Sequence, residues 1–309
     1  MDLDVAPCST GAAEKEMDVS AREISEIRAT GRDALMLATA LLQRARRAHP
    51  QSGLWEAADL QWWWRSPRRS DEVTKLFWID DEGPVAGVLL TSWTDDDWQC
   101  DPVVVPDGSG PEPDVVWIRA MEHAGTLAPN GFDVPVGDDD RTFTELAQRS
   151  GLTAGDRDST AWMDAADRPA VPALPEGFVL TDRAEHRDTP HPMRARNGDD
   201  VAQRLAQCTL YDPALDLAVE TDEGRVAGYS LYWFDPTTEA GLVEPVRVED
   251  EFQRRGLARA MLSVGIDRLV TAGAKRVKIS YETDAAAALY EGLGFRRTST
   301  ATWYRASAE

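Results

Sequence analysis

Hydrophobic positions in the second half of the chain follow a repeating order of strand-like and helix-like spacing. Short apolar strands are predicted at residues 178–182, 244–250 and 276–281, and a last one at about 298–305. Between the second and third strands, apolar residues recur every three or four positions and predict one buried helical face. Its members are Leu257, Met261, Leu262, Gly265, Ile266 and Leu269. A shorter helical stripe precedes the last strand, and Gly294 is placed to end that helix as a C-cap. The stripe consists of Ala286, Leu289, Tyr290 and Leu293.

The first half of the chain begins with a polar stretch at residues 1–20, which predicts a flexible tail. A short strand is predicted at residues 23–28 and a helix at residues 33–47. Three consecutive tryptophans follow at residues 62–64, and they cannot all face one core on a single helix or strand. We expect them to pack between two domains; a wall of a substrate site is the alternative.

Three segments of the chain recur at nearly constant spacing. Residues 81–87 (DEGPVAG) return at 222–228 as DEGRVAG, an offset of 141 residues, and both read as a turn entering an apolar strand. The pairs 101–107 with 244–250, and 146–152 with 289–295, share an offset of 143 residues. The chain is therefore predicted to hold two copies of one fold. The predicted copies span residues 21–164 and 178–309, joined by a proline-rich linker at residues 165–177.

A short basic segment, QRRGLA at residues 253–258, joins the strand at 244–250 to the long helix of the second copy. Gly256 has no Cβ and lets the backbone approach a ligand closely. The free N–H groups at the start of the helix favour an anion there. Arg254, Arg255 and Arg259 add positive charge. The segment therefore predicts a phosphate-binding loop.

Charge and composition narrow the classes of function. The net charge of −21 argues against a nucleic-acid binder, although it suits a cationic partner such as an amine. The three cysteines and four histidines show neither disulfide spacing nor metal-ligand spacing, so no metal is expected. No signal peptide and no membrane-spanning run is found, so we expect a cytoplasmic protein that does not bind membranes.

Two motifs of the second copy resemble the GNAT superfamily of acyl-CoA-dependent N-acyltransferases. The family's pyrophosphate loop, Gln/Arg-x-x-Gly-x-Gly/Ala, is matched by Gln253, Gly256 and Ala258. The family's late helix, Ala-x-x-Leu-Tyr-x-x-x-Gly-Phe, is matched at positions Ala286, Leu289, Tyr290, Gly294 and Phe295. The resemblance implies an α/β (α+β) fold with two tandem domains, each a mixed, mostly antiparallel twisted sheet flanked by helices. It also implies transfer of an acetyl group from acetyl-CoA to an amine.

The resemblance assigns roles to particular residues of the second copy. Tyr290 takes the position of the general acid that meets the leaving thiolate, and Glu244 is the best candidate for the base. Tyr281 and Glu282 are the alternatives for the base. Thr283 stands where the family often has a coenzyme-contacting Asn. The residues expected to hold the coenzyme are Val246, Arg247, Val248, Gln253, Arg254, Arg255, Gly256, Leu257, Ala258, Arg259 and Thr283. Among them, the N–H of Val246 or Val248 is expected to polarise the thioester carbonyl.

The first copy lacks these features. At the 143-residue offset, Gly110, Pro113 and Ala147 stand where the second copy has Gln253, Gly256 and Tyr290. Pro113 withholds a backbone N–H from the phosphate site, and the acidic residues on either side of it, at positions 112 and 114, repel an anion. We therefore expect one coenzyme per chain and a structural or substrate-shaping role for the first copy.

Three functions fit the sequence. The first is an N-acetyltransferase acting on a small-molecule or peptide amine, as a monomer or homodimer. The second is a mycothiol-synthase-like enzyme of the same tandem type, because the marked preference for arginine over lysine suits a GC-rich genome. The third is a non-catalytic acyl-CoA-binding sensor, which would bind coenzyme without releasing free thiol.

Overall fold

A single sheet of twelve strands runs through the described part of the chain. The computed structural model describes residues 23–51 and 53–307, so the tail predicted at residues 1–20 lies outside the described residues. The strand order is β1-β2-β3-β4-β5-β12-β6-β11-β10-β9-β8-β7. Most neighbouring strands are antiparallel; β4 with β5, and β10 with β11, are parallel. The predicted mixed, mostly antiparallel sheet flanked by helices is confirmed.

The two halves of the chain repeat the same order of elements. The first half contains β1 (Ser25–Ala29), α1 (Gly31–Ala48), α2 (Ala57–Trp63), β2 (Lys75–Asp80), β3 (Gly83–Ser92), β4 (Trp98–Val104), α3 (Pro113–Leu127), β5 (Gly131–Gly137), α4 (Arg141–Arg149) and β6 (Thr153–Asp164). The second half contains β7 (Phe178–Asp182), α5 (Arg194–Asn197), α6 (Val201–Leu205), β8 (Asp216–Thr221), β9 (Val226–Asp235), β10 (Ala240–Val248), α7 (Leu257–Ala272), β11 (Arg276–Tyr281), α8 (Asp284–Glu291) and β12 (Arg296–Ser307).

Several predicted boundaries are wrong. The strand expected at residues 244–250 begins earlier, at Ala240, and ends at Val248, because its first residues pair with both β9 and β11. The last strand of the second half, expected at about 298–305, is longer, at twelve residues, and the last strand of the first half has the same length. Gly294 is not the C-cap of α8: the helix ends at Glu291 with Gly292 as its cap, and Gly294 follows at a φ of 106°.

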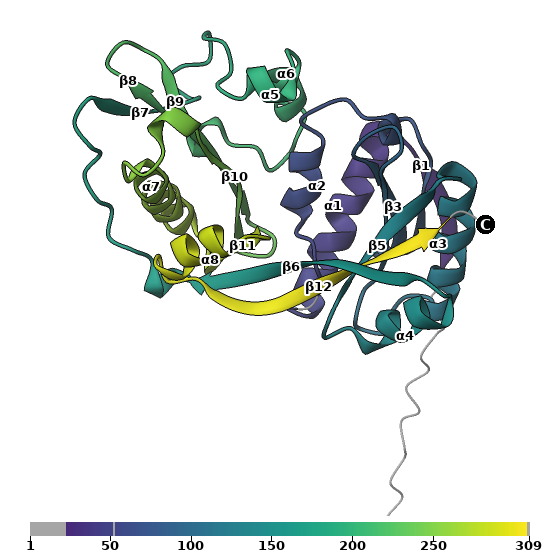
Figure 1. Cartoon of the computed structure of the whole chain (residues 1–309). Coiled ribbons are helices and arrows are strands. Elements are labelled where there is room, and N and C mark those ends of the chain that lie inside the picture. Colours follow the sequence, from purple (N-terminus) through teal and green to yellow (C-terminus); the bar gives the residue numbers. More distant parts are fainter. Residues whose placement is uncertain (1–22, 52, 308–309) are drawn as a thin grey trace, which may run out of the picture.

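The last strand of each half is exchanged with the other half. In the first half, β5 pairs with β12, as in the register Val136↔Thr302. In the second half, β11 pairs with β6, as in Ser280↔Thr160. Figure 1 shows β6 and β12 running side by side across the molecule and joining its two halves. The predicted linker at residues 165–177 separates the two copies along the sequence, but the sheet itself is continuous.

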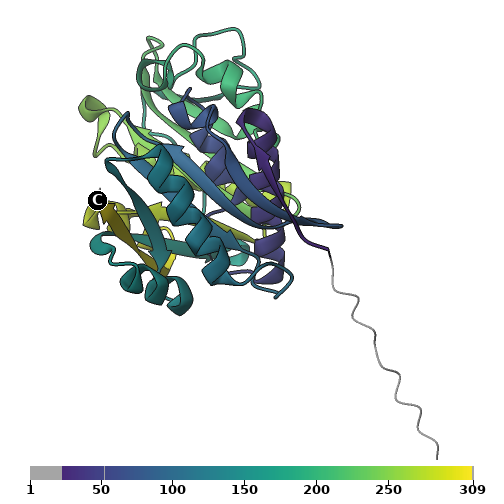
Figure 2. The same cartoon turned by 90° about the vertical axis from the view of Figure 1, so that its right-hand side faces the viewer.

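Helices α1 and α2 of the first half lie against the second half (Figures 1 and 2). Helix α2 contacts both β9 and β10. One buried apolar cluster accordingly contains residues of both halves, among them Leu41, Trp62 and Trp233. This packing brings Asp59 of α2 near Glu244, in the middle of β10.

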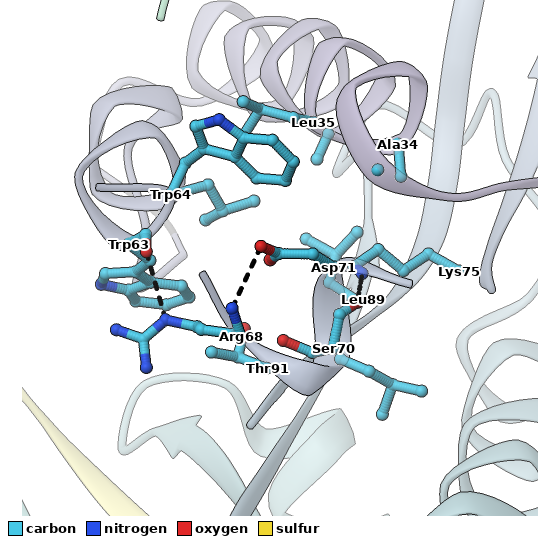
Figure 3. Close-up of a pocket in the computed structure, with 14 residues that line it drawn as sticks. Ala34, Leu35, Trp63, Trp64, Arg68, Ser70, Asp71, Lys75, Leu89 and Thr91 are labelled. Carbon is cyan, nitrogen blue, oxygen red and sulfur yellow. Dashed lines mark hydrogen bonds between the residues drawn. The ribbon is translucent and has the colours of Figure 1, made fainter. Parts of the chain in front are cut away.

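The three consecutive tryptophans are all buried in the same apolar cluster, so the expectation that they cannot all face one core is wrong; Trp64 is the C-cap of α2, and each ring has different neighbours. Trp62 lies under the guanidinium of Arg65, at 3.8 Å from the ring centre. Trp63 makes edge contacts with the rings of Trp55 and Trp93 and, with Trp64, lines a small pocket of about 50 Å³ (Figure 3). Trp64 is covered by the second half: its Nε1 donates to Gln207, and the Arg204 guanidinium lies 3.6 Å from its ring. The structure supports the interpretation of Trp64 as packing between the halves.

Candidate active site

Strands β10 and β11 separate in the middle of the second half. Their parallel pairing runs only from Ala240 to Leu242, whereas β10 stays paired with β9 as far as Val248. The pairing of β10 with β9 also shifts in register between Val243 and Val246. The backbone of residues 244–248 is therefore not bonded to β11. An extended ligand arm with amide groups can pair with such a strand edge.

The predicted phosphate loop leads directly into α7. Gly256 is the N-cap residue, with a φ of 82°, and no side chain caps the helix. The first N–H groups of α7, those of Leu257, Ala258 and Arg259, have no partner within the helix. A Cβ added at Gly256 would meet no atom within 4 Å. The start of α7 is thus an open cradle of N–H donors, which fits a pyrophosphate.

Basic side chains surround this cradle. Arg254, Arg255 and Arg259 are exposed or half-buried, and none of the three forms an ion pair within residues 23–51 and 53–307. Arg259 donates to the carbonyl of Gly292 at 3.2 Å and so links the start of α7 to the end of α8. The charge of Arg247 is less available, because acidic residues at positions 249 and 250 lie 3.4 and 3.5 Å away.

Two residues that were predicted to contact the coenzyme make hydrogen bonds within the protein. The Gln253 amide donates to the carbonyl of Val248 at 3.4 Å and to the Asp250 carboxylate at 3.1 Å, so it ties the loop to β10. Thr283 is the N-cap of α8, and its hydroxyl accepts from the N–H of Ala286 at 3.3 Å. Capping alone explains the hydroxyl at Thr283, and its predicted contact with the coenzyme stays a prediction.

The two predicted catalytic residues are near enough for the charge of Glu244 to act on Tyr290. Tyr290 on α8 is half-buried, with the rings of Tyr281 and Phe295 at 5.8 and 6.1 Å. Burial and, second, the charge of Glu244 raise the pKa of Tyr290 to about 12. The phenol is therefore protonated at neutral pH, the state that a general acid needs. The alternative base Glu282 is exposed and follows the last residue of β11, whereas Tyr281 contacts Tyr290 through its ring.

Glu244 faces a group of charged residues from both halves of the chain. Burial and then the neighbouring carboxyl of Asp59 raise the pKa of Glu244 well above its usual range. The positive charges of Arg65 and Lys278 act in the opposite direction. A carboxyl whose pKa is raised in this way is a stronger base than an ordinary glutamate.

The acid beside Glu244 comes from the first half. Asp59 lies on α2, and its Oδ2 accepts from Nζ of Lys278, on β11, at 3.1 Å. Lys278 also donates to the carbonyl of Leu54, and the side chains of Asp59 and Lys278 are 3 % and 1 % exposed. Sequence reasoning missed both residues. The only signal was a lysine within the otherwise apolar alternation of β11.

The corresponding loop of the first half differs from the predicted alignment by one residue. Helix α3 begins at Pro113 and takes Glu112 as its N-cap, so Glu112, rather than Pro113, occupies the place of Gly256. Asp114 follows in the first turn, and both carboxylates are exposed. Ala147 is the seventh residue of α4, as Tyr290 is of α8, and it is fully buried. The first half thus has no open anion cradle at this helix and no phenol.

The described ranges, 23–51 and 53–307, contain neither a metal-ligand cluster nor a membrane-spanning helix. In these ranges no three His, Cys, Asp or Glu side chains gather as metal ligands, and no helix has the length and apolar character to cross a bilayer. His191 lies in the loop before α5, where it is buried and bonded to Asp216 at 2.9 Å. That contact gives this histidine a structural role.

Comparison with known proteins finds a matching protein family and similar proteins. Residues 181–295 match the model of the acetyltransferase (GNAT) family. Mycothiol acetyltransferase from Kocuria rhizophila is 33 % identical over 185 residues, which cover 52 % of this chain and 60 % of that protein. The mycothiol acetyltransferase of Tsukamurella paurometabola is 28 % identical over 229 residues, 62 % of this chain and 77 % of that protein. The chain thus aligns with less than two thirds of the Kocuria protein.

Solved structures of low sequence identity share the fold. A tandem GNAT protein from the clavulanic acid biosynthesis pathway has a TM-score of 0.66 at 15 % identity, covering 93 % of this chain and 99 % of that one. A GCN5-related N-acetyltransferase from Sphaerobacter thermophilus has a TM-score of 0.58 at 16 % identity, covering 92 % and 96 %. The match to the acetyltransferase (GNAT) family model is confined to residues 181–295, and the likeness to these two structures shows that the chain shares their fold.

Proposed function

We propose that the chain is an N-acetyltransferase that moves an acetyl group from acetyl-CoA to the amine of a small acceptor. The observation that supports this proposal is the presence of three features together in the second half. Gly256 opens an anion cradle at α7, β10 separates from β11, and Tyr290 lies close enough to Glu244 for its pKa to respond to that charge.

The residues that would hold acetyl-CoA fit its chemistry. The N–H groups at the start of α7, with the arginines at positions 254, 255 and 259, suit a pyrophosphate. The open edge of β10 at residues 246–248 suits the amides of the pantetheine arm. When bound, acetyl-CoA supplies the acetyl group as a thioester. A backbone N–H of Val246 or Val248 is our proposed donor to the thioester carbonyl oxygen.

Proton transfer is assigned to two side chains. A simple amine arrives largely protonated at neutral pH and must lose a proton before it can attack. Glu244 accepts that proton, directly or through water, and its raised pKa keeps it basic enough for the task. Tyr290 remains protonated at neutral pH and donates to the departing sulfur.

The acceptor site is proposed to include α2 of the first half. Arg65 follows α2, donates to Asn197 at 2.6 Å and has no carboxylate within 4 Å among the described residues. Burial lowers the pKa of Arg65 to about 10, and Glu244 is the carboxylate whose charge opposes that effect. The first half therefore shapes the charge around the base, which matches the substrate-shaping role expected from the sequence.

A thiol-release assay with acetyl-CoA and a panel of amines tests the proposal. An enzyme releases free coenzyme A only with a suitable acceptor, whereas a non-catalytic sensor binds acetyl-CoA without releasing thiol. Glu244→Gln should remove the limb of the pH–rate profile that rises with pH, because the neutral amide cannot accept the proton. Tight acetyl-CoA binding with no thiol release from any amine would favour the sensor.

A mycothiol acetyltransferase activity is the second candidate. Two relatives with that name, at 33 % and 28 % identity, favour it. The acceptor of those enzymes belongs in the amine panel. A kcat/KM for that acceptor at least 100-fold above every other amine would establish it, and no turnover would exclude it. The expected cytoplasmic location, and the expected monomer or homodimer, remain predictions.

A further inference from the structure

The first half contains its own cavity at the place where its central strands separate. Strands β4 and β5 pair only at Gln99↔Asp133, as β10 and β11 do only near their start. Beyond this point lies a cavity of about 160 Å³, room for about five water molecules. Its walls include Trp55, Pro102 and Phe143. It is larger than the pocket beside Trp63 and Trp64, which measures about 50 Å³.

A buried carboxyl lines this cavity. Asp101 is 3 % exposed and accepts hydrogen bonds from Trp55 Nε1 at 2.8 Å and from Gln99 Nε2 at 2.8 and 2.9 Å. Both donors are neutral, and no cation lies within 4 Å of Asp101 in the described ranges. Burial raises the pKa of Asp101 to about 7. A buried carboxylate without a cation is costly, so a cationic ligand would be stabilised there.

The other charges around the cavity leave it acidic. Arg46 is neutralised by Glu56, with Nε at 3.1 Å from Oε2, and it also donates to the Pro50 carbonyl at 2.9 Å. Asp140 caps α4 through the N–H of Phe143, at 3.0 Å. Asp139, also in the lining, is exposed and adds a further negative charge. An anion such as a coenzyme is therefore disfavoured in this cavity.

Asp101 also has an acidic counterpart in the second copy of the repeat. At the 143-residue offset it stands where the second half has Glu244, and a proline follows both residues. The first half has thus lost the phosphate cradle and the phenol but has kept the buried acid beside an opening. The parallel with Glu244 rests on the proposed function, in which Glu244 faces the amine; the charge and volume of the cavity do not depend on it.

We propose that the cavity between β4 and β5 binds a small organic ammonium ion, with its charge on Asp101 and its apolar body against Trp55 and Phe143. Aromatic walls favour such cations through their negative ring faces. Because Asp101 is close to half-protonated at neutral pH, binding of the cation displaces a proton. Affinity should therefore rise with pH between about 6 and 8.

Calorimetric titration with benzylamine tests this site, in buffers of different ionisation enthalpy to count released protons. The Glu244→Gln variant is the background, so that binding at the proposed acceptor site is suppressed. We expect one benzylamine site in this background, with proton release, and no binding of neutral benzyl alcohol. Adding Asp101→Asn should weaken benzylamine binding at least tenfold.

The matched control is Asp158→Asn, because Asp158 also accepts from an indole, Nε1 of Trp303 at 2.7 Å, but lies outside the cavity. It should leave benzylamine binding unchanged. Binding that is lost in Glu244→Gln alone, or kept in Glu244→Gln with Asp101→Asn, would overturn the proposal. Equal affinity for benzyl alcohol would do the same, and this result needs no Asp101 variant to fold. Thiol release by the unmodified protein is measured separately, so failure of this site and failure of the proposed activity are distinguishable.

Discussion

Lys278 on β11 donates a hydrogen bond to Asp59 on α2 at 3.1 Å, although 219 residues separate them in sequence. Both side chains are almost fully buried, so the pair is shielded from solvent. The carboxyl of Asp59 also raises the pKa of Glu244, the proposed base. After burial, a residue of the half without a phosphate cradle is therefore the next largest influence on the proposed base in the half that has one.

Asp59→Asn tests this relationship through the pH–rate profile. Removing the negative charge stabilises the ionised form of Glu244 and lowers its pKa, so the rising limb should move to lower pH. The variant also leaves Lys278 unpaired, at a cost of about 3–5 kcal/mol in unfolding free energy. Asp59→Asn with Lys278→Met should recover part of that stability. If the rising limb of the pH–rate profile keeps its original pH in a folded Asp59→Asn variant, Asp59 does not influence the pKa of the base.

Gly256→Asp should abolish acetyl-CoA binding, because a side chain and a negative charge would both oppose the pyrophosphate. The fold should survive with a loss of about 1 kcal/mol, since the position has a φ of 82° but open space around it. Gly224→Asp is the matched control, with a φ of 78° and equally open surroundings in the β8–β9 turn. Calorimetric titration with acetyl-CoA compares the two. An unchanged affinity of Gly256→Asp for acetyl-CoA would show that this loop does not bind the coenzyme.

Tyr290→Phe should keep acetyl-CoA binding and lower kcat roughly 100-fold, because only the hydroxyl that meets the sulfur is lost. Tyr281→Phe changes the neighbouring ring, 5.8 Å away, and should have little effect. Steady-state thiol release measures both variants. Full activity in Tyr290→Phe would make Tyr290 a packing residue.

Coenzyme binding should saturate at one acetyl-CoA per chain. The first half presents Glu112 at the cap position of α3, followed by Pro113 and Asp114, where the second half has an open glycine cap. Restoring arginines there should not create a site, because the proline still withholds its N–H. Equilibrium titration gives the stoichiometry, and two molecules per chain would show that the first half is competent.

Stability should depend on pH through Asp101. Its pKa is raised to about 7 in the folded protein, so the folded state holds a proton that the unfolded state releases above about pH 4. Stability from this group is therefore full below pH 4 and is lost as the pH rises to 7, by roughly 4 kcal/mol at most. Asp101→Asn should remove that loss. Urea unfolding at pH 5 and pH 8 compares the two proteins; equal pH dependence would mean that Asp101 ionises normally.

Local sequence determined much of the second half. Helix α7 starts at Leu257, directly after Gly256, because the glycine and the apolar stripe both act within a few residues. Strand β11 has its predicted bounds for the same reason. Tyr290 and Glu244 were predicted separately, and the effect of the Glu244 charge on Tyr290 depends on tertiary packing.

Tertiary pairing could not be predicted in this way. Strands β6 and β12 have equal length and equivalent places in the repeat, so no local pattern says which of them lies beside β5. Asp59 and Lys278 look like surface residues in sequence, because a charged side chain is usually exposed. Their burial follows only from the packing of α2 on the second half.

The strand exchange has a consequence for synthesis on the ribosome. The pairing of β5 with β12, as in Val136↔Thr302, cannot form until residues 296–307 emerge from the ribosome. Until then, this edge of β5 is unpaired. Strand β6 is synthesised early, but its partner β11 is synthesised only after more than a hundred further residues, as the pair Thr160↔Ser280 shows. The nascent first half therefore carries open strand edges while residues 138–295 are synthesised, and such edges are sites of mispairing and aggregation. We expect the chain to complete its sheet only once both halves are available, which makes the nascent first half a natural client for chaperones.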